Sequence, residues 1–114
     1  MEELVTTSDR SGLLPGRSKD LFVVLFWRSS QGQNQETRLK LGDYDWPRCF
    51  RVVSIDLDGA QEIDEWFNVR TVPMVAVIHD GALLSMEFDF GDEACLRLAD
   101  CGRWKFAQMR ESYR

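Results

Sequence analysis

The feature that most constrains the fold is an unbroken run of seven apolar residues, Leu21–Trp27, rich in Val and Phe. This run is too short for a buried helix, and a membrane-spanning helix needs about 20 such residues. It suits a strand that is covered on both faces, as in sheets whose parallel strands are joined by helices. We therefore predict an α/β domain built around a central strand at 21–27.

Six further segments carry helix or strand signals. In chain order we expect a helix at 33–41, a strand at 50–57, a helix at 60–67, a strand at 74–78, a returning strand at 82–90 and a helix from 92 to about 110. Asp80-Gly81 is the hairpin signal between the last two strands. With a short edge strand at 2–7, this order predicts a central mixed sheet of four to five strands with helices on both faces.

Capping residues and apolar spacing define the first two helices. Gly42 can end the helix at 33–41 in a left-handed cap, and Asp58 is a natural N-cap for the helix at 60–67. Three apolar residues of that second helix recur at helical spacing and predict one buried stripe: Ile63, Trp66 and Phe67.

Length, composition and charge limit the class of function. The 114 residues fit one domain at 1–114, with a core at about 21–110, and 44% hydrophobic with 29% charged residues is ordinary globular usage. A net charge of −5 argues against a primary nucleic-acid or anionic-membrane surface. The N-terminus lacks the basic, then apolar, profile of a secretory signal. We expect a cytoplasmic protein, or one in another reducing compartment.

Cysteine and histidine content limits metal and redox chemistry. Cys49, Cys95 and Cys101 show no C-x-x-C spacing, so neither a zinc site nor a disulfide framework is supported. Cys95 and Cys101 lie about 120° apart around the predicted last helix and cannot close a local disulfide. Because His79 is the one histidine, sites with several histidines are excluded. We expect free thiols, no metal and no cofactor.

Four stretches of the chain resemble the thioredoxin superfamily. They are the strand at 23–27, the stretch 53–58, the segment 62–73 and the hairpin at 77–81. The spacing from Asp58 to Pro73, and from Pro73 to Gly81, matches the family without a gap. The resemblance implies the thioredoxin-like fold, with Pro73 at the position of the family's cis-proline and a cis bond after Val72.

The family's redox residues are absent from the matching positions. Thioredoxins place Cys-x-x-Cys a few residues after Phe-Trp. Counting on from Phe26-Trp27, those positions hold Gln31-Gly32-Gln33-Asn34. Amide side chains and glycine supply no thiolate, so thiol–disulfide exchange has no nucleophile there. The family's buried acid, which serves proton transfer, falls on Leu25. The resemblance therefore implies a relative without this activity, and we expect no enzyme.

Remnants of that site could bind an extended peptide. A cis bond before Pro73 would leave backbone groups facing a groove beside residues 31–34, where a peptide strand could pair. The candidate partner-binding residues are Trp27, Gln31, Gly32, Gln33, Asn34, Thr71, Val72 and Pro73. Pro73 could equally be a folding constraint and Trp27 a core residue, while Trp46 could add contact area.

The leading hypothesis is a non-enzymatic module that binds another protein as a chaperone, adaptor or assembly subunit. Among relatives without the cysteines, the pattern is similar to maturation chaperones of hydrogenases through Tyr44-Asp45-Trp46 and the Val-x-x-x-Pro that ends at Pro73. It is about as similar to thioredoxin-like light chains of larger cytoskeletal or RNA-processing machines. No direct nucleic-acid or membrane partner is expected.

Other hypotheses place the function elsewhere. Ser29 or Ser30 could activate glutathione, or a peripheral thiol could act in redox chemistry. An acidic cluster could dock an Arg-rich partner or be a solvated helix face; its members are Asp56, Asp58, Glu62, Asp64 and Glu65. The segment 103–110 could finish the last helix or extend to a partner.

Overall fold

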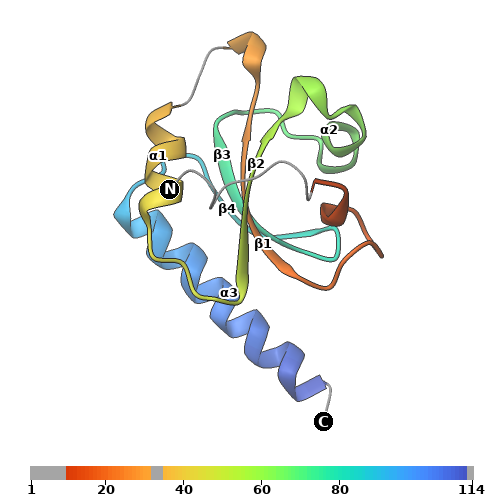
Figure 1. Ribbon diagram of the computed structural model, residues 1–114, viewed down its shortest axis with the longest axis vertical. Coiled ribbons are helices and arrows are strands. Elements are labelled where there is room, and N and C mark those ends of the chain that lie inside the picture. The colour runs from red at the N-terminus through yellow and green to blue at the C-terminus, as the bar shows by residue number, and fades with distance from the viewer. Residues whose placement is uncertain (1–9, 32–34, 113–114) are drawn as a thin grey trace.

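A central strand, β1, organises the structure, which is a computed structural model and describes residues 10–31 and 35–112. Figure 1 shows the chain and labels its α-helices and strands. In the text, η denotes a 3₁₀ turn. The elements in order are η2 (Arg10–Leu13), β1 (Leu21–Trp27), η3 (Ser29–Gln31), α1 (Gln35–Asp43), β2 (Phe50–Asp56), η4 (Leu57–Gly59), α2 (Gln61–Phe67), β3 (Met74–His79), β4 (Ala82–Glu87) and α3 (Asp92–Ser112). The predicted strand at 2–7 lies outside the described residues.

The sheet has the mixed topology that the sequence predicts. The described strands lie in the order β2-β1-β3-β4. β1 runs parallel to β2 and antiparallel to β3, and β3 pairs antiparallel with β4. In the β1–β3 ladder, Leu21 pairs with His79 and Phe26 with Met74. The end of β1 and the start of β3 therefore lie at the same end of the sheet.

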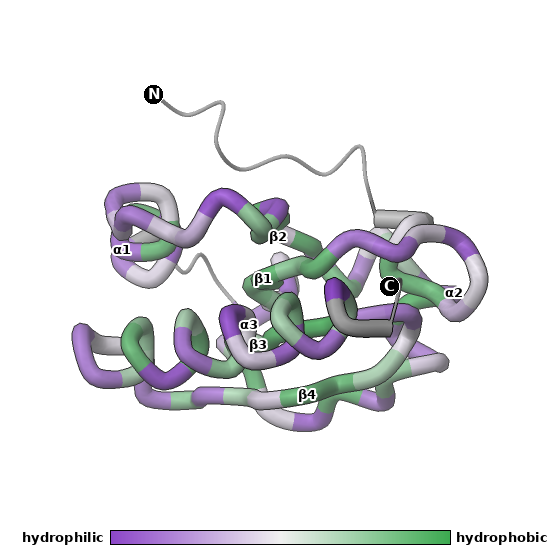
Figure 2. Tube along the Cα trace, turned by 90° about the horizontal axis from the view of Figure 1, so that it is seen from below, coloured by the Kyte–Doolittle hydropathy of each residue, from purple (hydrophilic) through white to green (hydrophobic). Residues whose placement is uncertain are grey.

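Side chains of β1 alternate between two hydrophobic cores, one on each face of the sheet. Phe22, Val24 and Phe26 point to the core that η2 and α2 cover, which includes Leu13 and Ile63. On the other face, Leu21, Val23 and Leu25 pack with Leu41 of α1 and Leu98 of α3. None of these six β1 residues is more than 1% exposed, so the strand is covered on both faces as predicted. Figure 2 shows α1 and α2 on opposite sides of the sheet.

Several predicted boundaries differ from those in the structure. α1 does not end at Gly42 but runs to Asp43, because the N–H of Tyr44 donates to the carbonyl of Lys40 and continues the helical pattern. β4 ends at Glu87, and Phe90 turns out of the sheet to stack on Trp46, with 6.5 Å between ring centroids. α3 continues to residue 112, and Figure 1 shows its C-terminal end projecting past the sheet.

The start of α2 also differs from prediction. Asp58 does not cap this helix; Ala60 holds the N-cap position, without a side-chain hydrogen bond. Asp56 instead caps the intervening turn η4, its carboxylate accepting from the N–H of Asp58 at 3.1 Å. The side chain of Asp58 is thereby free for a more distant partner, described below.

The predicted apolar stripe of α2 is narrower than expected. Ile63 is buried and Phe67 packs against the same core, but Trp66 is 54% exposed. Its indole N–H donates to the carbonyl of Gly81 at 2.8 Å, which places the ring on the surface. The carbonyl belongs to the predicted hairpin turn, which is confirmed: Asp80 and Gly81 both have positive φ, as a type I′ turn requires.

No helix among the described residues is both long and apolar enough to cross a bilayer.

Candidate functional site

The candidate site lies where β1 ends and β3 begins. Phe26 and Met74 form the last pair of the β1–β3 ladder. Trp27, which follows Phe26, and Pro73, which precedes Met74, therefore lie just beyond the ladder at the same end of the sheet. The Val72–Pro73 bond is cis, as predicted. Thr71 is exposed, whereas Val72 and Pro73 are half-buried.

The predicted binding residues fall into two segments at this end. Gln31, at the end of η3, is exposed, and its N–H donates to the carbonyl of Arg28 at 3.0 Å. Thr71, Val72 and Pro73 form the second segment. Three further predicted residues lie outside the described part of the chain: Gly32, Gln33 and Asn34.

Trp27 is anchored within the fold. Its indole N–H donates to the hydroxyl of buried Ser54 at 3.0 Å, and the guanidinium carbon of Arg38 lies 5.7 Å from the ring centroid. The ring packs against the core that α1 and α3 cover, as does Trp46, whose N–H donates to the carbonyl of Leu41. Both side chains therefore have packing roles, and contact with a partner stays a prediction.

Arg28 connects the end of β1 to the segment that leads to Pro73. Its guanidinium makes a forked pair with Asp64 of α2, at 3.0 Å from Nη1 to Oδ2 and 2.8 Å from Nη2 to Oδ1. Nη2 also donates to the carbonyl of Val69 at 3.1 Å, and Nη1 to Asp58 at 3.3 Å. The Arg28 side chain is only 19% exposed. These bonds join the end of β1 to η4, to α2 and to the backbone before Pro73, all of which lie at least 30 residues further along the chain.

Two carboxylates, one at the end of β2 and one in η4, fix η3. The N–H of Ser30 donates to Asp58 at 2.8 Å, and the N–H of Ser29 donates to Asp56 at 3.0 Å. The N–H of Ser30, its side chain and then the Arg28 guanidinium lower the pKa of Asp58 below its usual value. The hydrogen bond to Asp64 raises the pKa of Arg28 further, so both groups are charged at neutral pH. We call these contacts of Arg28, Ser29 and Ser30 the Arg28 network.

Sequence reasoning missed the Arg28 network. Its signal was present: an arginine directly follows the apolar strand, and the segment 56–65 has an excess of acids. The network takes up three members of the predicted acidic docking face: Asp56, Asp58 and Asp64. Glu62 and Glu65 remain exposed.

The thiols lie away from the candidate site and are poor nucleophiles. Burial raises the pKa of Cys49, Cys95 and Cys101, all of which are free. They are therefore protonated at neutral pH. Leu25, which the sequence resemblance aligns with the proton-transfer acid of thioredoxins, is fully buried in the core. Within residues 10–31 and 35–112 there is no cluster of His, Cys, Asp or Glu arranged to hold a metal ion.

Comparison with known proteins identifies the fold. No family model and no curated protein matches the chain. Among solved structures, a thioredoxin of Malassezia sympodialis (Mala s 13) is 16% identical over 82% of this chain and 84% of its own, with a TM-score of 0.60. A mutant thioredoxin from Halobacterium salinarum NRC-1 is 23% identical over 69% and 70%, with a TM-score of 0.51. A designed protein is 21% identical over 87% and 82%, with a TM-score of 0.57. The chain therefore has the thioredoxin-like fold.

Proposed function

We propose that this chain is a non-catalytic protein-interaction module, acting as a chaperone, adaptor or assembly subunit, that binds an extended peptide beside Thr71, Val72 and Pro73. The observation that carries the proposal is the Arg28 network. Hydrogen bonds between a guanidinium, carboxylates and a backbone carbonyl hold the segment that leads to Pro73, and no thiol takes part in them.

In this proposal, the backbone next to Pro73 pairs with a peptide strand. The backbone N–H and C=O groups of Thr71 and Val72 form no hydrogen bond with the described residues. The backbone just before them is held by the hydrogen bond from Arg28 Nη2 to the carbonyl oxygen of Val69, at 3.1 Å. Such pre-ordered, unpaired groups can pair with an extended chain at a low entropic cost. Exposed Thr71 and Gln31 would give the peptide side chains polar contacts.

The thiols and hydroxyls support a binding role better than an enzymatic one. The raised pKa values of the three thiols disfavour peripheral redox chemistry. The hydroxyl of Ser29 lies 3.4 Å from a carboxylate oxygen of Asp58, which occupies it as a donor. A hydroxyl that activates glutathione would instead have to donate to the substrate sulfur.

A maturation chaperone is one specific form of this proposal. The similarity to such chaperones of hydrogenases is carried by Tyr44-Asp45-Trp46, and here Tyr44 and Trp46 pack edge to face at 4.6 Å between centroids. A partner of this kind would be a protein subunit bound during assembly.

Peptide selection tests the binding site. Peptides without cysteine are selected from a random displayed library on the purified protein, and their Kd is measured by calorimetry. Thr71→Arg and Gln31→Arg should each raise the Kd at least about tenfold, because the larger side chain would occupy the proposed peptide site. The control Glu36→Arg adds the same side chain on exposed α1 and should change the Kd less than about twofold. Equal effects of all three variants would refute the site.

Insulin reduction tests the absence of thiol–disulfide exchange. With dithiothreitol as the reductant, the protein should not accelerate insulin precipitation beyond dithiothreitol alone. A rate comparable to that of a thioredoxin, abolished by Cys95→Ser or Cys101→Ser, would contradict the proposal.

A further inference from the structure

A pocket of about 390 Å³ opens between the η2 segment and α2, and it shares no residue with the candidate site. Its lining residues are Leu14, Pro15, Arg17, Glu62, Glu65 and Trp66. Leu14 is buried and belongs to the core, whereas the other lining residues are exposed. The pocket therefore has an apolar floor and a charged rim.

The hairpin turn at 80–81 supports the two segments that line this pocket. The indole N–H of Trp66 donates to the carbonyl of Gly81 at 2.8 Å. The N–H of Gly16 donates to the carboxylate of Asp80 at 2.7 Å, and Pro15 lies against Gly81 so closely that a Cβ there would clash with the proline ring. The hairpin turn thus fixes both the proline and the indole.

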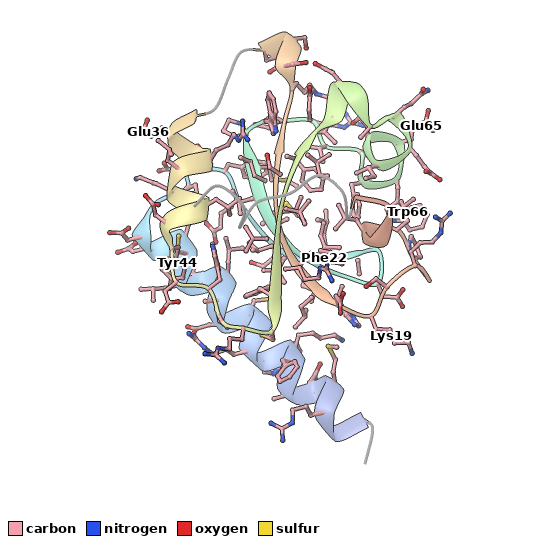
Figure 3. The ribbon with its side chains drawn as sticks, viewed as in Figure 1. Lys19, Phe22, Glu36, Tyr44, Glu65 and Trp66 are labelled. Carbon is pink, nitrogen blue, oxygen red and sulfur yellow. The ribbon has the colours of Figure 1, made fainter. Side chains whose placement is uncertain are left out.

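The Trp66 ring is therefore held in place and presents an ordered aromatic face to solvent. Its ring is held by its nitrogen and is still 54% exposed. Figure 3 shows Trp66 on the side of α2 next to η2, with Glu65 extending outward from the same helix. Tryptophan is one of the residue types enriched among the few side chains that dominate the binding energy of protein interfaces. An ordered, exposed tryptophan beside a pocket is therefore a candidate contact residue.

The rim carries two negative charges and one positive charge. Glu62 and Glu65 are the two members of the acidic cluster outside the Arg28 network, and Arg17 is the single cation of the lining. The carboxylate of Glu65 accepts from the side chain of Gln61 at 3.0 Å, which orients it. A guanidinium can stack on an indole while its edge donates to carboxylates, whereas an ammonium ion is a compact, strongly hydrated charge.

We propose that this pocket binds an arginine side chain from an exposed segment of a partner protein, stacked on Trp66 and paired with Glu62 and Glu65. This is a second contact site, separate from the proposed peptide site beside Pro73. Its occupant and its test are independent of the peptide proposed for that site.

The test is an NMR titration of the whole chain with a defined probe, the blocked tripeptide Ac-Gly-Arg-Gly-NH₂. Its lysine and citrulline counterparts are titrated in parallel, because citrulline keeps the shape of arginine and lacks its charge. We expect saturable shifts of the Trp66 indole N–H and of the backbone N–H groups of residues 62–66, with a Kd on the order of 1 mM for one side chain. The Kd should increase from arginine to lysine to citrulline.

Variants identify the groups that bind. Trp66→Leu should raise the Kd for the arginine probe at least about threefold by removing the aromatic face. Glu62→Gln and Glu65→Gln should each raise it about two- to fivefold. The matched control Glu36→Gln removes the same charge on the far side of the molecule, where Figure 3 shows Glu36 on α1, and should leave the Kd unchanged. Backbone N–H spectra confirm that each variant is folded.

Arg17 distinguishes a cation site from an anion site. Arg17→Gln should lower the Kd for the arginine probe, because it removes a like charge from the rim. A higher Kd in this variant would overturn the proposal, as would equal binding of the citrulline probe. Equal weakening by Glu36→Gln would also overturn it, since binding would then follow net charge alone. So would the absence of saturable shifts up to about 20 mM probe.

Discussion

At the scale of single residues, Arg28 joins parts of the chain that the sequence separates. Its guanidinium contacts Asp58 in η4, Asp64 in α2 and the carbonyl of Val69 before the cis-proline. The planar, permanently charged guanidinium can donate to all of these acceptors at once, which the single ammonium group of lysine cannot do. The geometry of the candidate site therefore depends on this side chain.

Arg28→Lys should lower the free energy of unfolding by about 1–3 kcal/mol, because half-buried Asp64 and the carbonyl of buried Val69 lose hydrogen bonds while the charge is kept. Urea unfolding followed by circular dichroism measures the change. The control is Arg51→Lys, in the exposed pair with Asp20, where a change below about 0.5 kcal/mol is expected. Equal changes in the two variants would contradict a special role for Arg28.

Asp58 should titrate below its ordinary pKa of about 3.9, because the bonds from Ser30 and Arg28 favour its charged form. The stabilisation by this carboxylate is present above the unfolded-state pKa and is lost as the pH falls through the lower folded-state pKa. An NMR titration of the carboxyl carbon measures it. Ser30→Ala should raise the pKa of Asp58 only part of the way to its ordinary value, because the N–H of residue 30 still donates to the carboxylate. A wild-type midpoint at or above 3.9 would show that these bonds do not form in solution.

At the scale of elements, the predictions are confirmed where the local sequence pattern determines the structure. They are wrong where a contact with a residue distant in the sequence determines it. Leu21–Trp27 and Asp80-Gly81 carry their own strand and turn signals, and both predictions are confirmed. Asp58 was predicted to cap α2, but the N–H of Ser30 takes its carboxylate. Trp66 was predicted to be buried, but the carbonyl of Gly81 holds it at the surface. Neither partner can be identified without the tertiary fold.

The packing of α3 on the sheet depends on a glycine. A Cβ at Gly102 would fall within the ring of Phe50 at the start of β2. Gly102→Ala should therefore lower the free energy of unfolding by about 1–3 kcal/mol through overpacking, despite the better helix propensity of alanine.

Urea unfolding measures the effect of Gly102→Ala against two comparisons. Gly59→Ala, where a Cβ meets nothing within 4 Å, should change stability far less. Phe50→Leu in the Gly102→Ala background should recover part of the loss by making room for the new methyl group. A neutral or stabilising Gly102→Ala would contradict the tight packing of α3 on β2.

At the scale of the whole molecule, the sequence predicted the fold better than the binding surface. The sheet and its covering helices leave periodic apolar signals and turn signals along the chain, and the element order followed from them. The candidate site depends on Arg28, Asp58 and Asp64, which the fold brings together from separate segments. A surface that recognises another protein leaves no such period in the sequence, so the partner's identity was not predictable.

The central claim is recognition beside Pro73 without any thiol, and a comparative capture experiment tests it most directly. Tagged wild-type chain, a cysteine-free chain (Cys49→Ala, Cys95→Ala and Cys101→Ala) and Thr71→Arg are expressed in the native cells, and bound proteins are quantified by mass spectrometry after non-reducing purification. The account predicts that the same partner is retained by the wild-type and cysteine-free chains and depleted at least about tenfold by Thr71→Arg. A partner that is released by dithiothreitol, absent from the cysteine-free chain and unaffected by Thr71→Arg would contradict it.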